Sequence, residues 1–263
     1  MSGSQMDPAS MPAGEPTHVE RGQGSGEVVI RAEKLEAGFG KSHILFGINF
    51  EAREHDITVI VGPNGCGKST LLKSIFGLTT IYSGDIKYGS EKITGLPPHM
   101  ITRRKIAYLP QVNNVFVNLT IRENLLMASY LMNRKEFDER LPAVFATFPI
   151  LEKLQNKKST MLSGGQRQML GMGMAMMRQP KLMLFDEPTA GLSPKLADEV
   201  LQKITQMRDE FEMTVVLVEQ DVRRALKIGD VVYLFAGGRN IFDGSPAELM
   251  AQPELGKMYL GVH

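Results

Sequence analysis

A β-branched run and a glycine-rich loop stand side by side at residues 57–69, and together they restrict the fold more than any other feature of this chain. The run, Ile-Thr-Val-Ile-Val at 57–61, is typical of a strand covered on both faces. The loop at 62–69, Gly-Pro-Asn-Gly-Cys-Gly-Lys-Ser, fits the pattern G-x-x-x-x-G-K-[ST], and residues 68–77 read as a helix. This order predicts an α/β protein that binds the phosphates of a nucleoside triphosphate.

The residue types of the loop suit a dense anion. Gly62, Gly65 and Gly67 allow the backbone to wrap around phosphates without Cβ clashes, and N–H groups at a helix N-terminus attract negative charge. We expect Lys68 to reach the β- and γ-phosphates and the Ser69 hydroxyl to bind Mg²⁺. The other positions that we assign to nucleotide binding in this segment are Pro63, Asn64, Cys66 and Thr70, with Thr70 next to the α-phosphate.

A second apolar run, at residues 182–185, ends in two carboxylates. Asp186, as the acid at a strand end, is expected to hold Mg²⁺ directly or through water. Glu187 is the candidate for polarising the attacking water, because a carboxylate can serve as a base there. Taken alone, paired acids at a strand end are more often solvated surface, but the phosphate loop upstream favours a site.

The remaining pattern predicts the organisation of the chain. Strand and helix signals alternate through residues 57–61, 182–185 and 215–218, which indicates a largely parallel sheet with helices on both sides. Short strands are expected at 28–30 and 48–50, and a closing hairpin at 231–242. Residues 119–177 carry helical signals, among them Thr120 with Glu123 as a capping box. We therefore expect a P-loop NTPase fold with a mainly parallel sheet core, an antiparallel β subdomain and an inserted helical subdomain at about 112–177.

Composition excludes several classes of function. The formal net charge of +1 gives no whole-chain argument for nucleic acid, and no nucleic-acid partner is expected. Cys66 is the one cysteine of the chain, so an internal disulfide is impossible. No apolar stretch reaches the ~18 residues that suggest a membrane-spanning helix, and we expect no secretory signal. Residues 1–26 are rich in Gly, Ser, Pro and Met and are predicted to be a disordered tail.

Residues 162–166 read Leu-Ser-Gly-Gly-Gln and lie between the phosphate loop and the acidic strand end. In this order the three motifs resemble an ATP-binding cassette (ABC) ATPase, and the resemblance covers residues 27–263. It implies that Ser163, Gly164, Gly165 and Gln166 contact ATP held by a facing subunit, so that two ATPase subunits, identical or related, close each site. ATP and Mg²⁺ are the implied cofactors.

Three further positions follow the resemblance, and two of them depart from the commonest residue. Gln111, after Tyr108-Leu109-Pro110, resembles the glutamine-loop residue, which implies contact with Mg²⁺ and coupling to a membrane partner. Phe39 stands where the family stacks an aromatic residue, more often tyrosine, on adenine. Gln220 stands where most cassettes have a histidine that contacts the γ-phosphate. An amide can donate one hydrogen bond but cannot carry an imidazolium charge, which motivates the hypothesis of slow hydrolysis at this site.

Other segments indicate a subfamily. Residues 95–99, 118–125, 190–194, 218–220 and 259–261 resemble the ATP-binding subunits of branched-chain amino acid importers, in which a glutamine at position 220 is itself familiar. The resemblance implies membrane permease subunits, a separate solute-binding protein and a place at the cytoplasmic face of the cell membrane. The alternatives are a cassette that energises transport of urea, short amides or lipid, and a soluble cassette factor such as one for iron–sulfur assembly.

The sequence leaves two local properties open, the reactivity of Cys66 and the burial of residues 112–119. Cys66 lies inside the phosphate loop, where we expect its side chain to be a small space-filler. A nearby helix N-terminus can also lower the pKa of a thiol, so we expect alkylation to inhibit ATP binding and ATP to protect. The apolar segment at 112–119, which includes Phe116, is either a buried loop or one wall of a groove for a membrane subunit.

Overall fold

Two β-sheets form the centre of the molecule. The computed structural model describes residues 26–112 and 114–255, so residues 1–25 of the expected tail and the segment 259–261 lie outside the described residues. The larger sheet has the strand order β10-β9-β3-β8-β7-β6. Its strands are β3 (Ile57–Val61), β6 (Ile106–Leu109), β7 (Leu182–Asp186), β8 (Thr214–Val218), β9 (Val231–Ala236) and β10 (Arg239–Gly244). All neighbouring pairs are parallel except the hairpin of β9 and β10.

The smaller sheet is antiparallel and has the order β2-β1-β4-β5. Its strands are β1 (Val28–Phe39), β2 (Ser42–Arg53), β4 (Thr80–Tyr88) and β5 (Glu91–Lys92). The strands expected at 28–30 and 48–50 are therefore pieces of two 12-residue strands. The predicted fold class, a mainly parallel core with an antiparallel β subdomain and inserted helices, is confirmed.

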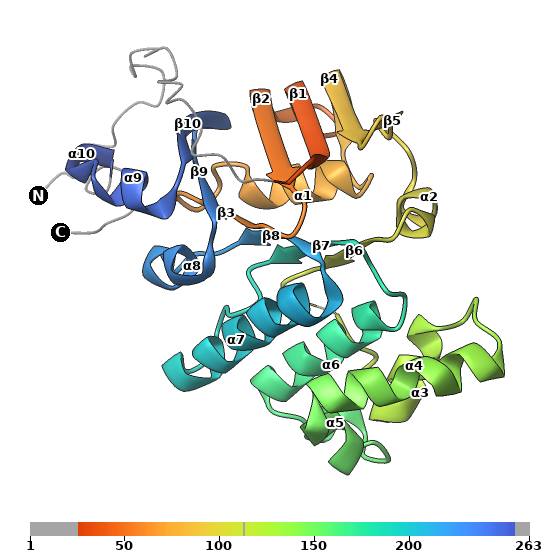
Figure 1. The fold of residues 1–263 in the computed structure, drawn as a ribbon. Coiled ribbons are helices and arrows are strands. Elements are labelled where there is room, and N and C mark those ends of the chain that lie inside the picture. Colours follow the sequence, from red (N-terminus) through yellow and green to blue (C-terminus); the bar gives the residue numbers. More distant parts are fainter. Residues whose placement is uncertain (1–25, 113, 256–263) are drawn as a thin grey trace, which may run out of the picture.

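The parallel strands separate two hydrophobic clusters because successive side chains point to opposite faces of the sheet. Ile60, Leu184 and Val216 face α1 (Lys68–Ile75) and the antiparallel sheet. Val59, Phe185 and Leu217 face the opposite cluster, which includes residues of α6 (Gly164–Met176) and α7 (Pro194–Phe211). Figure 1 shows this layering, with the four-stranded sheet and α1 on one side and α6 and α7 on the other. The six-stranded sheet is thus buried on both faces.

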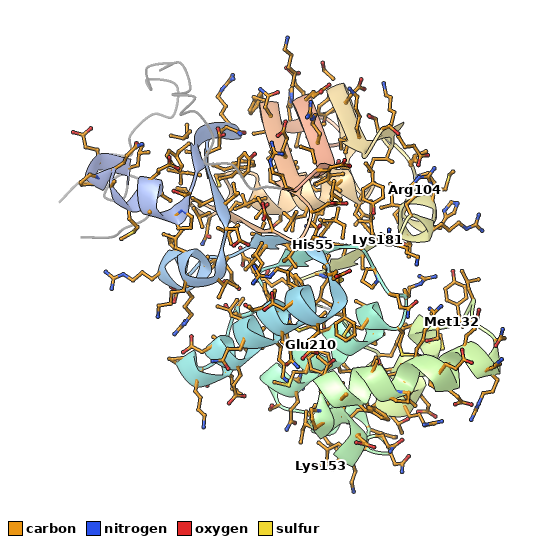
Figure 2. The ribbon with its side chains drawn as sticks, viewed as in Figure 1. His55, Arg104, Met132, Lys153, Lys181 and Glu210 are labelled. Atoms are coloured by element: carbon orange, nitrogen blue, oxygen red, sulfur yellow. The ribbon has the colours of Figure 1, made fainter. Side chains whose placement is uncertain are left out.

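A layer of helices is inserted between β6 and β7. It contains α3 (Ile121–Ala128), α4 (Arg134–Thr147), α5 (Pro149–Lys153), a 3₁₀ turn at Ser159–Met161 and α6. The other helices are α2 (Pro98–Arg103), α8 (Val222–Ile228), α9 (Pro246–Met250) and α10 (Pro253–Leu255). Lys153, at the end of α5, points away from the body of the molecule (Figure 2). Among the described residues no helix is both long and apolar enough to cross a membrane.

A buried amide fixes the segment between the sheet and this helical layer. Asn124 of α3 is fully buried, and its Oδ1 accepts a hydrogen bond from the Phe116 N–H at 2.7 Å. Its Nδ2 donates to the Phe116 carbonyl at 3.0 Å and to Ser159 Oγ at 3.0 Å. One side chain therefore holds both backbone groups of Phe116 and connects them to the turn before α6.

We predict that Asn124→Ala lowers the free energy of unfolding by about 1–3 kcal/mol, because it leaves buried backbone groups of Phe116 without partners. The exposed Asn156 in the same layer provides the matched control, and Asn156→Ala should change stability by less than about 0.5 kcal/mol. Urea denaturation followed by circular dichroism measures both variants. Equal stability of the two would show that Asn124 does not hold this segment.

Candidate functional site

The glycine-rich loop connects β3 to α1, and two of its glycines are required by their surroundings. Gly62 has φ 142°, and a Cβ there would lie 2.1 Å from the Phe235 carbonyl oxygen. Gly67, the N-cap of α1, has φ 105°, and a Cβ would lie 2.5 Å from Leu45 Cδ2. Larger residues at these positions would displace neighbouring backbone or core, which accounts for the glycines in the motif.

Lys68 lies inside the loop. It is 4 % exposed, and its Nζ donates to the carbonyl oxygens of Gly62 at 2.8 Å and Pro63 at 3.0 Å. Pro63, Asn64 and Gly65 are exposed at the rim, whereas Thr70 is buried behind the loop. The ammonium group is thus surrounded by the backbone of the loop at the N-terminus of α1, an environment that suits a polyanion.

Asp186 ends β7 with both carboxylate oxygens hydrogen-bonded. Ser69 Oγ donates to Oδ1 at 2.6 Å, and the Tyr108 hydroxyl donates to Oδ2 at 2.9 Å. Burial, together with the neighbouring charge of Asp186, raises the pKa of Tyr108, so its hydroxyl remains protonated and acts as the donor. The structure therefore brings together Ser69 and Asp186 as expected, and adds Tyr108, to which the sequence patterns gave no role.

Glu187, one residue later, has a different set of partners. It is 8 % exposed and has φ 50°, in the left-handed region that few non-glycine residues adopt. Its Oε2 accepts hydrogen bonds from Gln111 Nε2 at 2.9 Å and from Gln220 Nε2 at 2.7 Å. Burial is the main cause that raises the pKa of Glu187. Three residues assigned separately from the sequence thus meet at one carboxylate oxygen.

A buried carboxylate behind this group connects two loops. Glu219, at the end of β8, is 2 % exposed and accepts a hydrogen bond from the Thr189 N–H at 3.1 Å. It also accepts from the Gln220 N–H at 3.2 Å. Burial raises the pKa of Glu219. Glu219 was not predicted as a site residue, although its position beside Gln220 after an apolar strand was a usable signal.

The Leu-Ser-Gly-Gly-Gln segment lies apart from the phosphate loop. Ser163 is the N-cap of α6, where its Oγ accepts from the Gln166 N–H at 3.3 Å and its own N–H donates to Gln166 Oε1 at 3.0 Å. Gln166 is therefore used to cap the helix. Ser163 and Gly164 are exposed and Gly165 is buried against Leu196. Because α6 and α1 pack on opposite faces of the sheet, the exposed Ser163 and Gly164 form a second polar surface, separate from that of the phosphate loop.

Phe39, the last residue of β1, is the aromatic residue expected beside the nucleotide base. Its side chain is 43 % exposed, and Lys73 Nζ lies 5.9 Å from its ring centroid. A ring of this exposure at the end of a strand offers a face for stacking.

Cys66 contradicts the expected lowered pKa. The residue is 5 % exposed, and burial raises the pKa of its thiol despite the nearby charge of Lys68. Desolvation of the thiolate outweighs the favourable charge, so Cys66 is a space-filling residue and not an activated thiol.

The oxygen donors at Ser69 and Asp186 fit Mg²⁺. This ion prefers hard oxygen ligands and is usually held by one or two protein groups together with substrate phosphates. In residues 26–112 and 114–255, no three His, Cys, Asp or Glu side chains form a group that could hold a metal by themselves. A hydroxyl and a carboxylate side by side at the phosphate loop therefore match Mg²⁺ bound with a nucleotide better than a metal site built from protein ligands alone.

Comparison with known proteins agrees with this geometry. Residues 45–190 match the family model described as "ABC transporter". The chain is 46 % identical over 234 residues to the "Probable branched-chain amino acid transport ATP-binding protein LivF" of Archaeoglobus fulgidus, an alignment that covers 89 % of this chain and 99 % of that protein. It is 36 % identical to the "High-affinity branched-chain amino acid transport ATP-binding protein BraG" of Pseudomonas aeruginosa, covering 89 % and 100 %.

The fold is also similar to that of a solved structure. That structure is described as the dimeric structure of a post-hydrolysis state of an ATP-binding cassette bound to ADP and Pi, and it superposes with a TM-score of 0.72 at 25 % sequence identity. The match covers 82 % of this chain and 98 % of that one. The family model spans more than half of the present sequence, and the relatives align over almost their whole length. The chain therefore belongs to the ABC transporter family.

Proposed function

We propose that this protein is the ATP-binding and ATP-hydrolysing subunit of an ABC importer for branched-chain amino acids. The observation that carries the catalytic part is the meeting of the phosphate loop with two differently bonded carboxylates, Asp186 and Glu187, at the carboxyl ends of β3 and β7. The solute is suggested by the names of LivF and BraG, which align with this chain over 99 % and 100 % of their lengths.

The residues of the loop bind and orient the triphosphate. Lys68 Nζ exchanges one of its carbonyl contacts with Gly62 and Pro63 for phosphate oxygens, and the N–H groups at the start of α1 neutralise further charge. Ser69 and Asp186 would hold Mg²⁺, which would supply neutralisation of phosphate charge when bound. Phe39 stacks on the base.

Glu187 polarises the attacking water. Its raised pKa makes it a better proton acceptor than an ordinary carboxylate, while the amides of Gln111 and Gln220 keep Oε2 oriented. Catalysis then consists of positioning and charge stabilisation, with no covalent enzyme intermediate.

A second subunit completes the site. Ser163 and Gly164 are exposed at the N-terminus of α6, where N–H groups favour an anion, yet they belong to the opposite face of the sheet from Lys68. Two copies, or this chain and a related subunit, can face each other so that Ser163 of one closes the loop of the other. The dimeric cassette structure supports this arrangement.

An apolar surface beside Gln111 is proposed as the docking surface for membrane permease subunits. Its exposed side chains come from the segment after β6 and from the end of α3, and they are Val112, Phe116, Val117, Leu126, Met127, Tyr130 and Leu131. The buried-loop alternative for Phe116 is wrong, because the side chain is 49 % exposed. Exposed large apolar side chains that gather in one region are a feature of interaction surfaces. A place at the cytoplasmic face of the membrane and a partner solute-binding protein follow from the same proposal.

The dimer is tested with Glu187→Gln and Ser163→Asp. Glu187→Gln keeps an acceptor for Gln111 and Gln220 but cannot take a proton, so Mg-ATP should convert this variant into stable dimers in light scattering coupled to size exclusion. Adding Ser163→Asp retains a good helix N-cap while placing negative charge against the phosphates, and it should abolish the dimer. If Glu187→Gln binds nucleotide but remains monomeric, alone and with its companion subunit, the two-subunit site is wrong.

Cys66 reports on occupancy of the loop. Alkylation requires the thiolate, and the raised pKa of Cys66 makes the thiolate scarcer at pH 7–8 than in a free cysteine. We expect N-ethylmaleimide to label the folded protein several-fold more slowly than the urea-unfolded chain, with rates that rise toward higher pH, and Mg-ATP to slow labelling further. Mass spectrometry measures the modified fraction, which belongs to one site because Cys66 is the single cysteine. Equal labelling with and without Mg-ATP contradicts ATP binding at this loop.

Phe116→Ala tests the docking surface. Since the side chain is exposed and lies outside the catalytic contacts, we expect ATP binding and ATPase activity of the isolated protein to stay within about twofold of wild type. Transport by the assembled importer in vesicles should fall at least tenfold. Phe211→Ala, which removes a ring 39 % exposed at the end of α7, is the matched control and should transport normally. A parallel loss of ATPase activity in Phe116→Ala would instead indicate a structural role.

A further inference from the structure

The second oxygen of the Asp186 carboxylate has a partner that the proposed mechanism does not use. We infer that Tyr108 is a positioning residue, which fixes the orientation of Asp186 and thereby sets the affinity of the site for Mg²⁺ with nucleotide. This inference rests on the proposed function, since it concerns the same metal-binding carboxylate.

The sheet explains why the tyrosine hydroxyl reaches this oxygen. β6 and β7 are parallel neighbours, and Tyr108 pairs with Leu184. Asp186 lies two residues beyond Leu184 on the same face of its strand, toward the carboxyl edge, and the length of a tyrosine side chain covers that offset. The result is the 2.9 Å hydrogen bond from the hydroxyl to Oδ2.

The ring that carries the hydroxyl is itself held. Phe76, which caps the C-terminus of α1, packs against it with ring centroids 5.4 Å apart at an interplanar angle of 37°. Ser69 lies in the first turn of the same helix and donates to the other oxygen, Oδ1. One helix therefore positions both donors of Asp186, Ser69 directly and Tyr108 through the Phe76 ring.

A carboxylate bonded at both oxygens has little freedom to rotate. Groups that hydrogen-bond a metal ligand orient it, and their removal costs on the order of 10- to 100-fold in metal affinity or activity. Tyr108→Phe deletes the hydroxyl and keeps the ring against Phe76, so Asp186 retains its Ser69 contact and loses its second constraint. Tyr108→Phe should therefore lower the affinity for Mg²⁺ and leave the affinity for metal-free nucleotide unchanged.

The experiment uses the full-length protein and a fluorescent ATP analogue. For wild type and Tyr108→Phe, analogue binding is titrated with Mg²⁺, and affinity is also measured in EDTA. Bound Mn²⁺ is counted by electron paramagnetic resonance, and the melting temperature of the nucleotide-free protein is recorded. The matched control is Tyr88→Phe, which removes a hydroxyl from a partly buried tyrosine of β4 in the other sheet.

We expect Tyr108→Phe to raise the half-saturating Mg²⁺ concentration about tenfold, to weaken Mn²⁺ binding in parallel, and to leave affinity in EDTA unchanged. Tyr88→Phe should match wild type in both metal titrations. A wild-type Mg²⁺ dependence in Tyr108→Phe overturns the inference, as does an equal loss of affinity in EDTA and with Mg²⁺, because that pattern indicates general damage. If nucleotide affinity of the wild type is itself indifferent to Mg²⁺, the proposed function fails, and the inference fails with it.

Discussion

The active-site geometry depends on keeping two adjacent carboxylates ionisable at a buried strand end. Asp186 and Glu187 are 4 % and 8 % exposed, and a buried charge is costly unless it is hydrogen-bonded. The fold satisfies them with different chemistry, since Asp186 receives two hydroxyl donors and Glu187 receives two amide donors. The four donors come from α1, from β6 and from the loops that follow β6 and β8, so the pair of carboxylates depends on β6 and β8 being the neighbours of β7.

The parts of the fold that sequence patterns predict are those with one dominant physical signal. β3, β7 and β8 are buried at every residue, and each contains four apolar residues among its five, a run that indicates such a strand directly. β4 (Thr80–Tyr88) was not predicted, because Ile86 is the one buried residue of this strand and its apolar and polar side chains do not alternate regularly. The lengths of β1 and β2 were underestimated for a related reason, since their half-buried pairing extends beyond the apolar segments.

In the candidate site, too, residues that form a contiguous motif were predictable, whereas contacts between residues far apart in the sequence were not. The residues of the phosphate loop follow from a contiguous motif, but the hydrogen bonds to Glu187 join positions 33 and 76 residues apart, and only the strand order brings them together. The expected pKa of Cys66 was wrong because position relative to a helix terminus can be read from sequence, whereas burial cannot. In that thiol, desolvation is the larger effect.

The contact between Gln220 and Glu187 indicates what a glutamine does at position 220. Its amide donates to Glu187 Oε2 at 2.7 Å, while Gln111 donates to the same oxygen. Both donors are amides that do not titrate between pH 5 and 8, where a histidine gains and loses its proton. A charged imidazolium would lower the pKa of Glu187 more than an amide does, whereas an amide orients the carboxylate with a smaller effect on its basicity. The absence of histidine at this position is therefore compatible with ATP hydrolysis, because two amides hold the Glu187 carboxylate in its place.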